Sequence, residues 1–185
     1  MKRIFLTLAV IANCVLVTAL FFGLWVGDPN TRDLVVQQRI STHMLVGLGA
    51  LTFATLVHAI LFTYFMGTGR WLEETSRAYS LDQVWHSENQ RIKYGTLPGM
   101  VVCLLLLITT GALGAAADPA TPVSLDGFLG MSGSTIHFTI AITTASVNLI
   151  VNIMELIAIH RNGMIIEGVL AEVRRIRLDR GLPVE

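Results

Sequence analysis

The histidines of this chain are the residues best suited to chemistry, and three of the five lie inside long apolar runs or at their start. His43 and His137 each follow a Ser-Thr-containing segment at the start of such a run. A b-type haem takes neutral imidazoles from facing helices as ligands to its iron, while the protein sets orientation and dielectric. The sequence therefore makes His43 and His137 candidate ligands of haem iron, the one metal that it suggests.

The expected depth of these two histidines supports that hypothesis. We expect both in the first turn of a membrane span that begins on the external side, just below the lipid headgroups. The positive end of a helix dipole disfavours a protonated imidazole, so each ring would stay available as a ligand. The alternative is that both are interfacial residues that bond to lipid headgroups or loop carbonyls.

His58 and Glu155 are ionisable residues that the sequence places inside spans. Such groups are costly in hydrocarbon and usually mark a pathway or a site. His58 follows His43 by 15 residues, which is about 22 Å along a helix. His58 and Glu155 are expected at similar depths, where they form one wall of a quinone pocket, a proton site, or a structural hydrogen bond between helices. Asn152 matches His58 in the other half, so a second intrachain bis-histidine haem lacks its partner ligand.

The order of these residues suggests an internal repeat. Cys14, an apolar run, Asp28-Pro29 and His43 in the first half resemble Cys103, an apolar run, Asp118-Pro119 and His137 in the second. A duplication of this kind would relate the halves by a pseudo-two-fold axis along the membrane normal.

Composition identifies the elements that must position these residues. The chain has 185 residues, of which 53% are hydrophobic and only 14% charged, with a mean hydropathy of +0.64. A transmembrane helix needs about 20 mostly apolar residues. Four segments meet this requirement, namely residues 4–26, 43–66, 97–117 and 136–159. We therefore predict an all-α integral membrane protein, a single four-helix membrane domain over residues 1–185.

Basic residues predict the orientation of these spans. With both termini in the cytoplasm, 11 of the 13 Lys and Arg residues lie on the cytoplasmic side. Arg32 and Arg39 fall outside, and residues 118–133 contain no basic residue. The sequence thus predicts an N-in, C-in protein of a bacterial-type inner membrane.

Two cytoplasmic segments have an amphipathic helical pattern. In the loop of residues 68–93, Ser80-Leu-Asp-Gln83 matches a capping box that would open a short second helix. In the tail of residues 161–185, apolar residues recur at helical spacing and arginines gather late. The tail either extends the fourth span, lies along the anionic leaflet, or docks a partner.

Several function classes are excluded or unsupported. Zero net charge gives no overall attraction for nucleic acid. The chain has no Cys-x-x-Cys-His for covalent haem, no His-Glu-x-x-His, no phosphate-binding loop and no nucleophile elbow. With one polar helix face and no pair of broken helices, transport is the weakest reading. No catalytic motif marks the chain as an enzyme by itself.

Two hypotheses remain. In the first, the chain is a small membrane-anchor subunit of a redox complex that binds b-type haem or quinone between spans two and four, an architecture similar to that of the haem-bearing anchors of respiratory enzymes. In the second, it is a non-catalytic structural or assembly subunit. Both imply the lipid bilayer and other membrane subunits, or further copies of the chain, as partners.

Overall fold

Four long helices form one bundle in the computed structural model, which describes residues 1–28, 31 and 33–183. Pro29 and Arg32, which enter the repeat and the charge count above, lie outside these residues. The helices are α1 (Lys2–Leu24), α2 (Leu34–Tyr79), α3 (Val84–Ala116) and α4 (Gly133–Asp179), with a single 3₁₀ turn, η1 (Phe128–Gly130), before α4. All four are long and apolar enough to cross a membrane.

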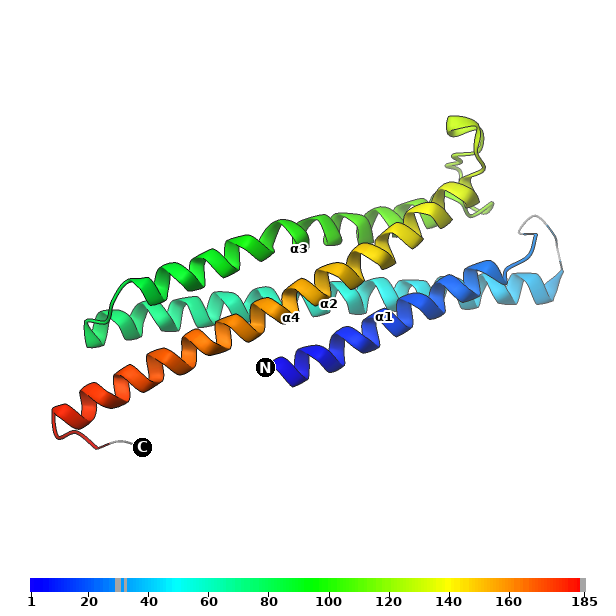
Figure 1. The fold of residues 1–185 in the computed structure, drawn as a ribbon. Coiled ribbons are helices and arrows are strands. Elements are labelled where there is room, and N and C mark those ends of the chain that lie inside the picture. The colour runs from blue at the N-terminus through cyan, green and yellow to red at the C-terminus, as the bar shows by residue number, and fades with distance from the viewer. Residues whose placement is uncertain (29–30, 32, 184–185) are drawn as a thin grey trace.

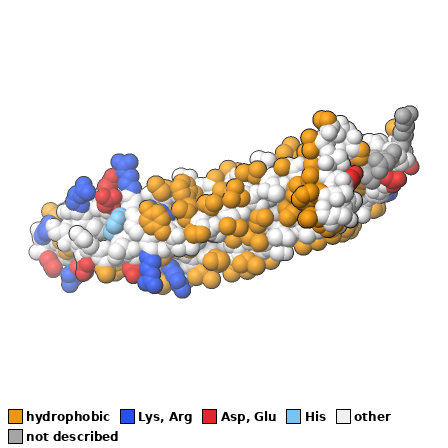
Figure 2. Space-filling view, turned by 90° about the horizontal axis from the view of Figure 1, so that it is seen from above, with side chains coloured by type: hydrophobic (Ala, Val, Ile, Leu, Met, Phe, Trp, Pro, Cys, Tyr) orange, Lys and Arg blue, Asp and Glu red, His pale blue; other side chains and the backbone are white. Residues whose placement is uncertain are grey.

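The two ends of the bundle differ in character. At one end, which we call the loop end, α1 is followed by α2, and α3 by the longer connection that contains η1 and projects from the bundle (Figure 1). At the other end, which we call the charged end, α2, α3 and α4 continue well beyond the start of α1 (Figure 1). A broad hydrophobic surface lies between these ends, and most of the charged side chains in view gather at the charged end (Figure 2). This banding matches the composition of a chain that crosses hydrocarbon.

Three helices are longer than the apolar runs that predicted them. The polar segment of residues 68–93 is no separate loop helix, because α2 runs without a break to Tyr79 and α3 starts at Val84. The capping-box prediction is wrong: Ser80 ends α2 in a left-handed conformation, with φ of 54°, and the Asp82 carboxylate accepts from the Val84 backbone N–H. The tail extends α4 to Asp179, as one of the three alternatives predicted.

Short polar side chains begin the helices at the loop end. The Asp33 side chain accepts from Val35 N–H at 2.8 Å, and the Ser132 hydroxyl accepts from Thr135 N–H at 3.2 Å. Each satisfies a backbone donor that the first helical turn leaves free. Asp126, in the connection before α4, accepts from Gly133 N–H at 2.7 Å and fixes this connection on the start of α4.

The buried positions of the two hairpins correspond at constant separations. In α1 and α3 they lie 91 residues apart, as in Phe5 and Thr96 or Ala19 and Thr110. In α2 and α4 they lie 94 residues apart, as in Ala50 and Thr144. The remaining pairs are Ala9 with Met100, Ala12 with Cys103, Leu16 with Leu107, Ala54 with Asn148, Val57 with Val151, His58 with Asn152, Leu61 with Glu155 and Phe65 with Ile159.

This correspondence corrects one pairing made from the sequence. Cys103 is buried at the position that Ala12 occupies in the first hairpin, whereas Cys14 is exposed. The cysteines therefore do not match, although His43 and His137 do, at the same separation of 94 residues as the buried pairs. The two hairpins use one packing pattern with different side chains.

Candidate functional site

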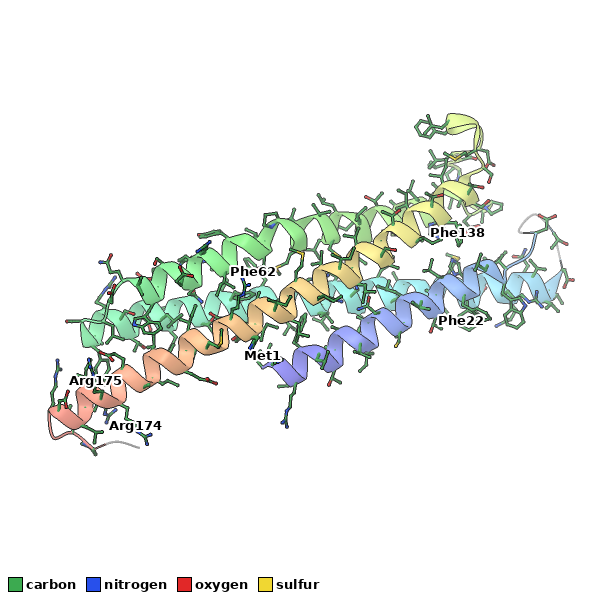
Figure 3. The ribbon with its side chains drawn as sticks, viewed as in Figure 1. Met1, Phe22, Phe62, Phe138, Arg174 and Arg175 are labelled. Atoms are coloured by element: carbon green, nitrogen blue, oxygen red, sulfur yellow. The ribbon has the colours of Figure 1, made fainter. Side chains whose placement is uncertain are left out.

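The imidazoles of His43 and His137 face each other between α2 and α4 at the loop end. Their ring centroids are 6.1 Å apart, with an angle of 70° between the ring planes. Both side chains are half-buried. Phe22 and Phe138, next in sequence to Gly23 and His137, lie near this end of the bundle (Figure 3). The structure thus brings together the two residues predicted as a ligand pair.

Each imidazole rests on a glycine of the preceding helix. A Cβ atom at Gly23 would lie 3.0 Å from His43 Cε1, and a Cβ atom at Gly114 would lie 3.1 Å from His137 Cε1. Both distances are shorter than ordinary carbon contacts. Gly23 and Gly114 are themselves separated by 91 residues, so both hairpins make the same space for the same ring. Sequence reasoning missed these glycines, and the available signal was their position shortly before the two Asp-Pro segments, five residues before Asp28 and four before Asp118.

Hydrogen bonding orients His43 more firmly than His137. His43 Nδ1 lies 3.1 Å from the Ala19 carbonyl oxygen, which only accepts, so Nδ1 donates and Nε2 keeps a free lone pair. A carbonyl partner of this kind commonly fixes the orientation of a metal-binding histidine. His137 Nδ1 has no hydrogen-bond partner, although Thr110, the equivalent of Ala19, lies beside it.

The predicted helix-dipole effect does not apply to His43. Because α2 begins at Leu34, His43 lies in the third turn of the helix and not in the first. His137 lies in the second turn of α4. A helix dipole acts mainly within its first turn. What orients His43 is therefore its bond to the Ala19 carbonyl.

His58 and Glu155 meet at the centre of the bundle, fully buried. His58 Nδ1 lies 2.8 Å from Glu155 Oε1, and His58 Nε2 lies 3.1 Å from Asn148 Oδ1. Asn148 also accepts from the Cys103 thiol at 3.4 Å and donates to Asn13 Oδ1 at 3.1 Å. We call these five residues the central cluster, and they come from all four helices. Sequence reasoning missed Asn13 and Cys103, because a single polar residue in an apolar run does not reveal which way it faces.

Glu155 of the central cluster and the neighbouring Asn152 carry buried polar atoms without a hydrogen-bond partner. Glu155 Oε2 and both amide atoms of Asn152 are buried without a hydrogen bond. The two residues are three positions apart on α4, so their side chains leave one face of the helix. An unsatisfied buried polar atom costs about 1–3 kcal/mol, which makes these atoms points where a further ligand would bind.

A second group of polar side chains lies two helical turns from Glu155 toward the charged end. We call it the inner cluster, and it consists of Tyr64, Thr68, Asn89 and Asn162. Asn162 Nδ2 donates to the Tyr64 hydroxyl at 3.0 Å and to the Thr68 hydroxyl at 3.1 Å. Asn89 Nδ2 donates to Asn162 Oδ1 at 2.6 Å. His86 and His160 join neither cluster: His86 contacts Gln90, and His160 is exposed.

Known proteins add no assignment to these sites. A comparison with protein-family models, with curated proteins and with solved structures found no match. Among the described residues, no three His, Cys, Asp or Glu side chains gather in a way that could hold a metal ion. What the arrangement offers is a pair of facing imidazoles at one depth and a buried acid–imidazole pair at another.

Proposed function

We propose that this chain is the membrane-anchor subunit of an electron-transfer complex and that it binds b-type haem between His43 and His137. The observation that carries the proposal is the 6.1 Å between the two imidazole centroids. Metal–imidazole bonds of about 2.0 Å on opposite sides of one iron place the ring centres roughly 6 Å apart. The spacing of the pair therefore fits an iron held between the two rings.

The surrounding residues fit the same group. Gly23 and Gly114 leave each ring in place without a side-chain clash, and the Ala19 carbonyl accepts from His43 Nδ1, so Nε2 is the nitrogen that would bind metal. Haem, when bound, would supply one-electron chemistry. The chain itself would hold the ligands at fixed separation and exclude water from the apolar centre of the bundle.

The optical spectrum tests this proposal. Protein purified in detergent, alone or in its native complex, should show a Soret band and sharp reduced α and β bands. His43→Ala and His137→Ala should each abolish these bands and lower the melting temperature, because a bound group stabilises only the folded state. His86→Ala serves as the matched control and should keep the spectrum. A colourless, stable and fully assembled protein would refute haem binding.

His58 and Glu155 are, in this proposal, the quinone or proton site of the same subunit. The second candidate function, a structural or assembly subunit, has its own observation in its favour. The central cluster joins all four helices through hydrogen bonds, as polar groups do when they hold membrane helices together. The colourless outcome above would leave this second function in place.

The proposed subunit has both termini and the charged end on the cytoplasmic side of a bacterial-type inner membrane. The uneven distribution of Lys and Arg supports this orientation. Arg174 and Arg175 lie far along α4 at the charged end (Figure 3). Single cysteines introduced at Thr121 and Gly181 test it with a membrane-impermeant thiol reagent on sealed cells. Thr121→Cys should react and Gly181→Cys should not, and reaction at Gly181 alone would reverse the orientation.

A further inference from the structure

The connection between α3 and α4 exposes apolar side chains at its tip, by which we mean residues 127–131. Phe128 is 58% exposed and Leu129 is 77% exposed. The tip contains no charged residue, and the whole connection, residues 118–132, contains only two, both of them aspartates. Adjacent exposed apolar side chains of this kind mark a surface that meets a protein partner or lipid.

Hydrogen bonds hold the tip in one shape. Gly127 N–H donates to the Met131 carbonyl oxygen at 2.9 Å, and Met131 N–H donates to the Phe128 carbonyl oxygen at 3.1 Å. Gly127, Leu129 and Gly130 all have a left-handed backbone, with φ of 85°, 54° and 72°. Glycine adopts this conformation readily, whereas leucine is strained in it. The turn therefore keeps Leu129 exposed at an energetic cost, and strain of this kind points to a function.

The connection is tied to the ends of both helices that it joins. The Thr121 hydroxyl donates to the Ala115 carbonyl oxygen of α3 at 2.9 Å, and Asp126 accepts from the N–H of Gly133, the first residue of α4, at 2.7 Å. The tip is thus held close to the level at which α3 ends and α4 begins. In Figure 1 it projects sideways from these helix ends, away from α1 and α2, and not along the axis of the bundle.

The first hairpin has a helix where the second has this turn. Phe128 lies 94 residues after Leu34, which is the separation that relates α4 to α2. Leu34 is already the first residue of α2, so in the first hairpin this position continues along the bundle. In the second hairpin α4 starts only at Gly133, the equivalent of Arg39. The second hairpin therefore replaces more than one turn of helix with a tip that lies beside the bundle.

The direction of the tip favours lipid over a partner in water. α3 and α4 are long and apolar enough to cross a membrane. A helix that spans the hydrocarbon ends near the headgroups, so a sideways projection from its end lies in the plane of the membrane, at the boundary with water. An apolar side chain at this boundary is buried among the acyl chains, as the apolar face of an interfacial helix is.

We propose that Phe128 and Leu129 form an interfacial anchor that inserts into the membrane leaflet at the loop end. The anchor contacts the acyl region of the lipids and selects no headgroup charge, because the tip is uncharged. Since Asp126 ties the connection to Gly133, the anchor sets the depth at which α4 starts, and with it the depth of His137 one turn further along. The inference goes beyond the proposed function and does not depend on haem.

Spin labels on the full chain, reconstituted alone in liposomes, test the anchor. A label is attached to Leu129→Cys in a Cys14→Ala background, in which the remaining cysteine, Cys103, is buried. Leu34→Cys is the matched control, because it is the equivalent leucine position of the first hairpin, as exposed but on a helix. At position 129, collisions with oxygen, which concentrates in hydrocarbon, should exceed collisions with a water-soluble nickel chelate. The ratio of the two collision rates should be several-fold lower at position 34.

Two results would overturn the anchor. Equal ratios at positions 129 and 34 would place the tip in water, and strong dipolar broadening between labels at position 129 would assign the tip to contact with a second copy of the chain. Leu129→Gly separates anchoring from folding. This change relieves the left-handed strain, so the melting temperature in detergent should stay the same or rise, while a label at Phe128→Cys should move toward water. An unchanged depth of that label would remove Leu129 from the anchor.

Discussion

The two hairpins, α1–α2 and α3–α4, bury equivalent positions. They carry the same residue types at the loop end and different residue types in the centre. At the loop end the equivalence extends to function-bearing residues: Gly23 with Gly114, and His43 with His137. In the centre it does not. Ala54 and Leu61 of the first hairpin correspond to Asn148 and Glu155 of the second.

This difference separates two kinds of site. Under the proposed function, one iron between the two hairpins would take the same ligand from each, which fits the symmetry of the loop end. A hydrogen-bonded pair needs a donor facing an acceptor, which two equal residues do not supply as well. The central cluster accordingly draws its acid, Glu155, and the amide that contacts the imidazole, Asn148, from one half and the imidazole itself from the other.

The largest loss of stability should come from breaking the His58–Glu155 pair. His58→Leu leaves Glu155 buried without its partner, and removal of one member of a buried ion pair costs about 3–5 kcal/mol. The double variant His58→Leu/Glu155→Leu should recover most of that loss, because the two apolar side chains need no partner. Thermal unfolding in detergent gives the coupling energy. Additive effects would show that the two residues do not act as a unit.

Asn152→Leu is the control supplied by the other hairpin. Asn152 occupies the position equivalent to His58, yet both of its amide atoms are unpartnered. Its replacement should therefore leave the melting temperature unchanged or raise it, since an unsatisfied buried group is removed. A large loss of stability in this variant would mean that Asn152 is bonded after all.

A smaller loss of stability, equal in both hairpins, is expected from substitutions at the loop end. Gly23→Ala and Gly114→Ala each place a methyl group about 3 Å from an imidazole carbon, and overpacking of this kind costs about 1–3 kcal/mol. Under the proposed function, both should also broaden or shift the haem bands by the same amount. Gly49→Ala, where no atom lies within 4 Å, should instead be neutral or slightly stabilising. Unequal responses of Gly23 and Gly114 would break the symmetry of this site.

The sequence predicts the fold more completely than it predicts the contacts between side chains. Apolar runs of sufficient length identify the four helices, and matched positions identify the histidine pair, because both depend on spacing along the chain. The extensions of α2, α3 and α4 at the charged end could not be predicted in this way. There the helices continue through segments of mixed polarity and pack on one another, as Trp85 of α3 does on Gly168 of α4. Asn13 and Cys103 could not be assigned either, because their role depends on which face of a uniformly apolar helix turns inward.

The smallest energetic effect should come from Asn13→Leu, which gives the first hairpin the residue that Leu104 supplies at the equivalent position of the second. Hydrogen bonds between membrane helices contribute about 0.6 kcal/mol on average, so the loss of the Asn13–Asn148 bond should lower stability only slightly. Its consequence for the tautomer of His58 is larger. Asn13 Nδ2 lies 2.8 Å from the Ala9 carbonyl oxygen, which only accepts, so the Asn13 oxygen faces the Asn148 nitrogen. The Asn148 oxygen then faces His58 Nε2, which carries a hydrogen. Without Asn13 the Ala9 carbonyl no longer sets the direction of the Asn148 amide, which becomes free to present its nitrogen to His58. His58 would then adopt both tautomers, and the ¹⁵N spectrum should show a bare Nε2 in part of the population. A single protonated Nε2 in this variant would show that Glu155 alone selects the tautomer.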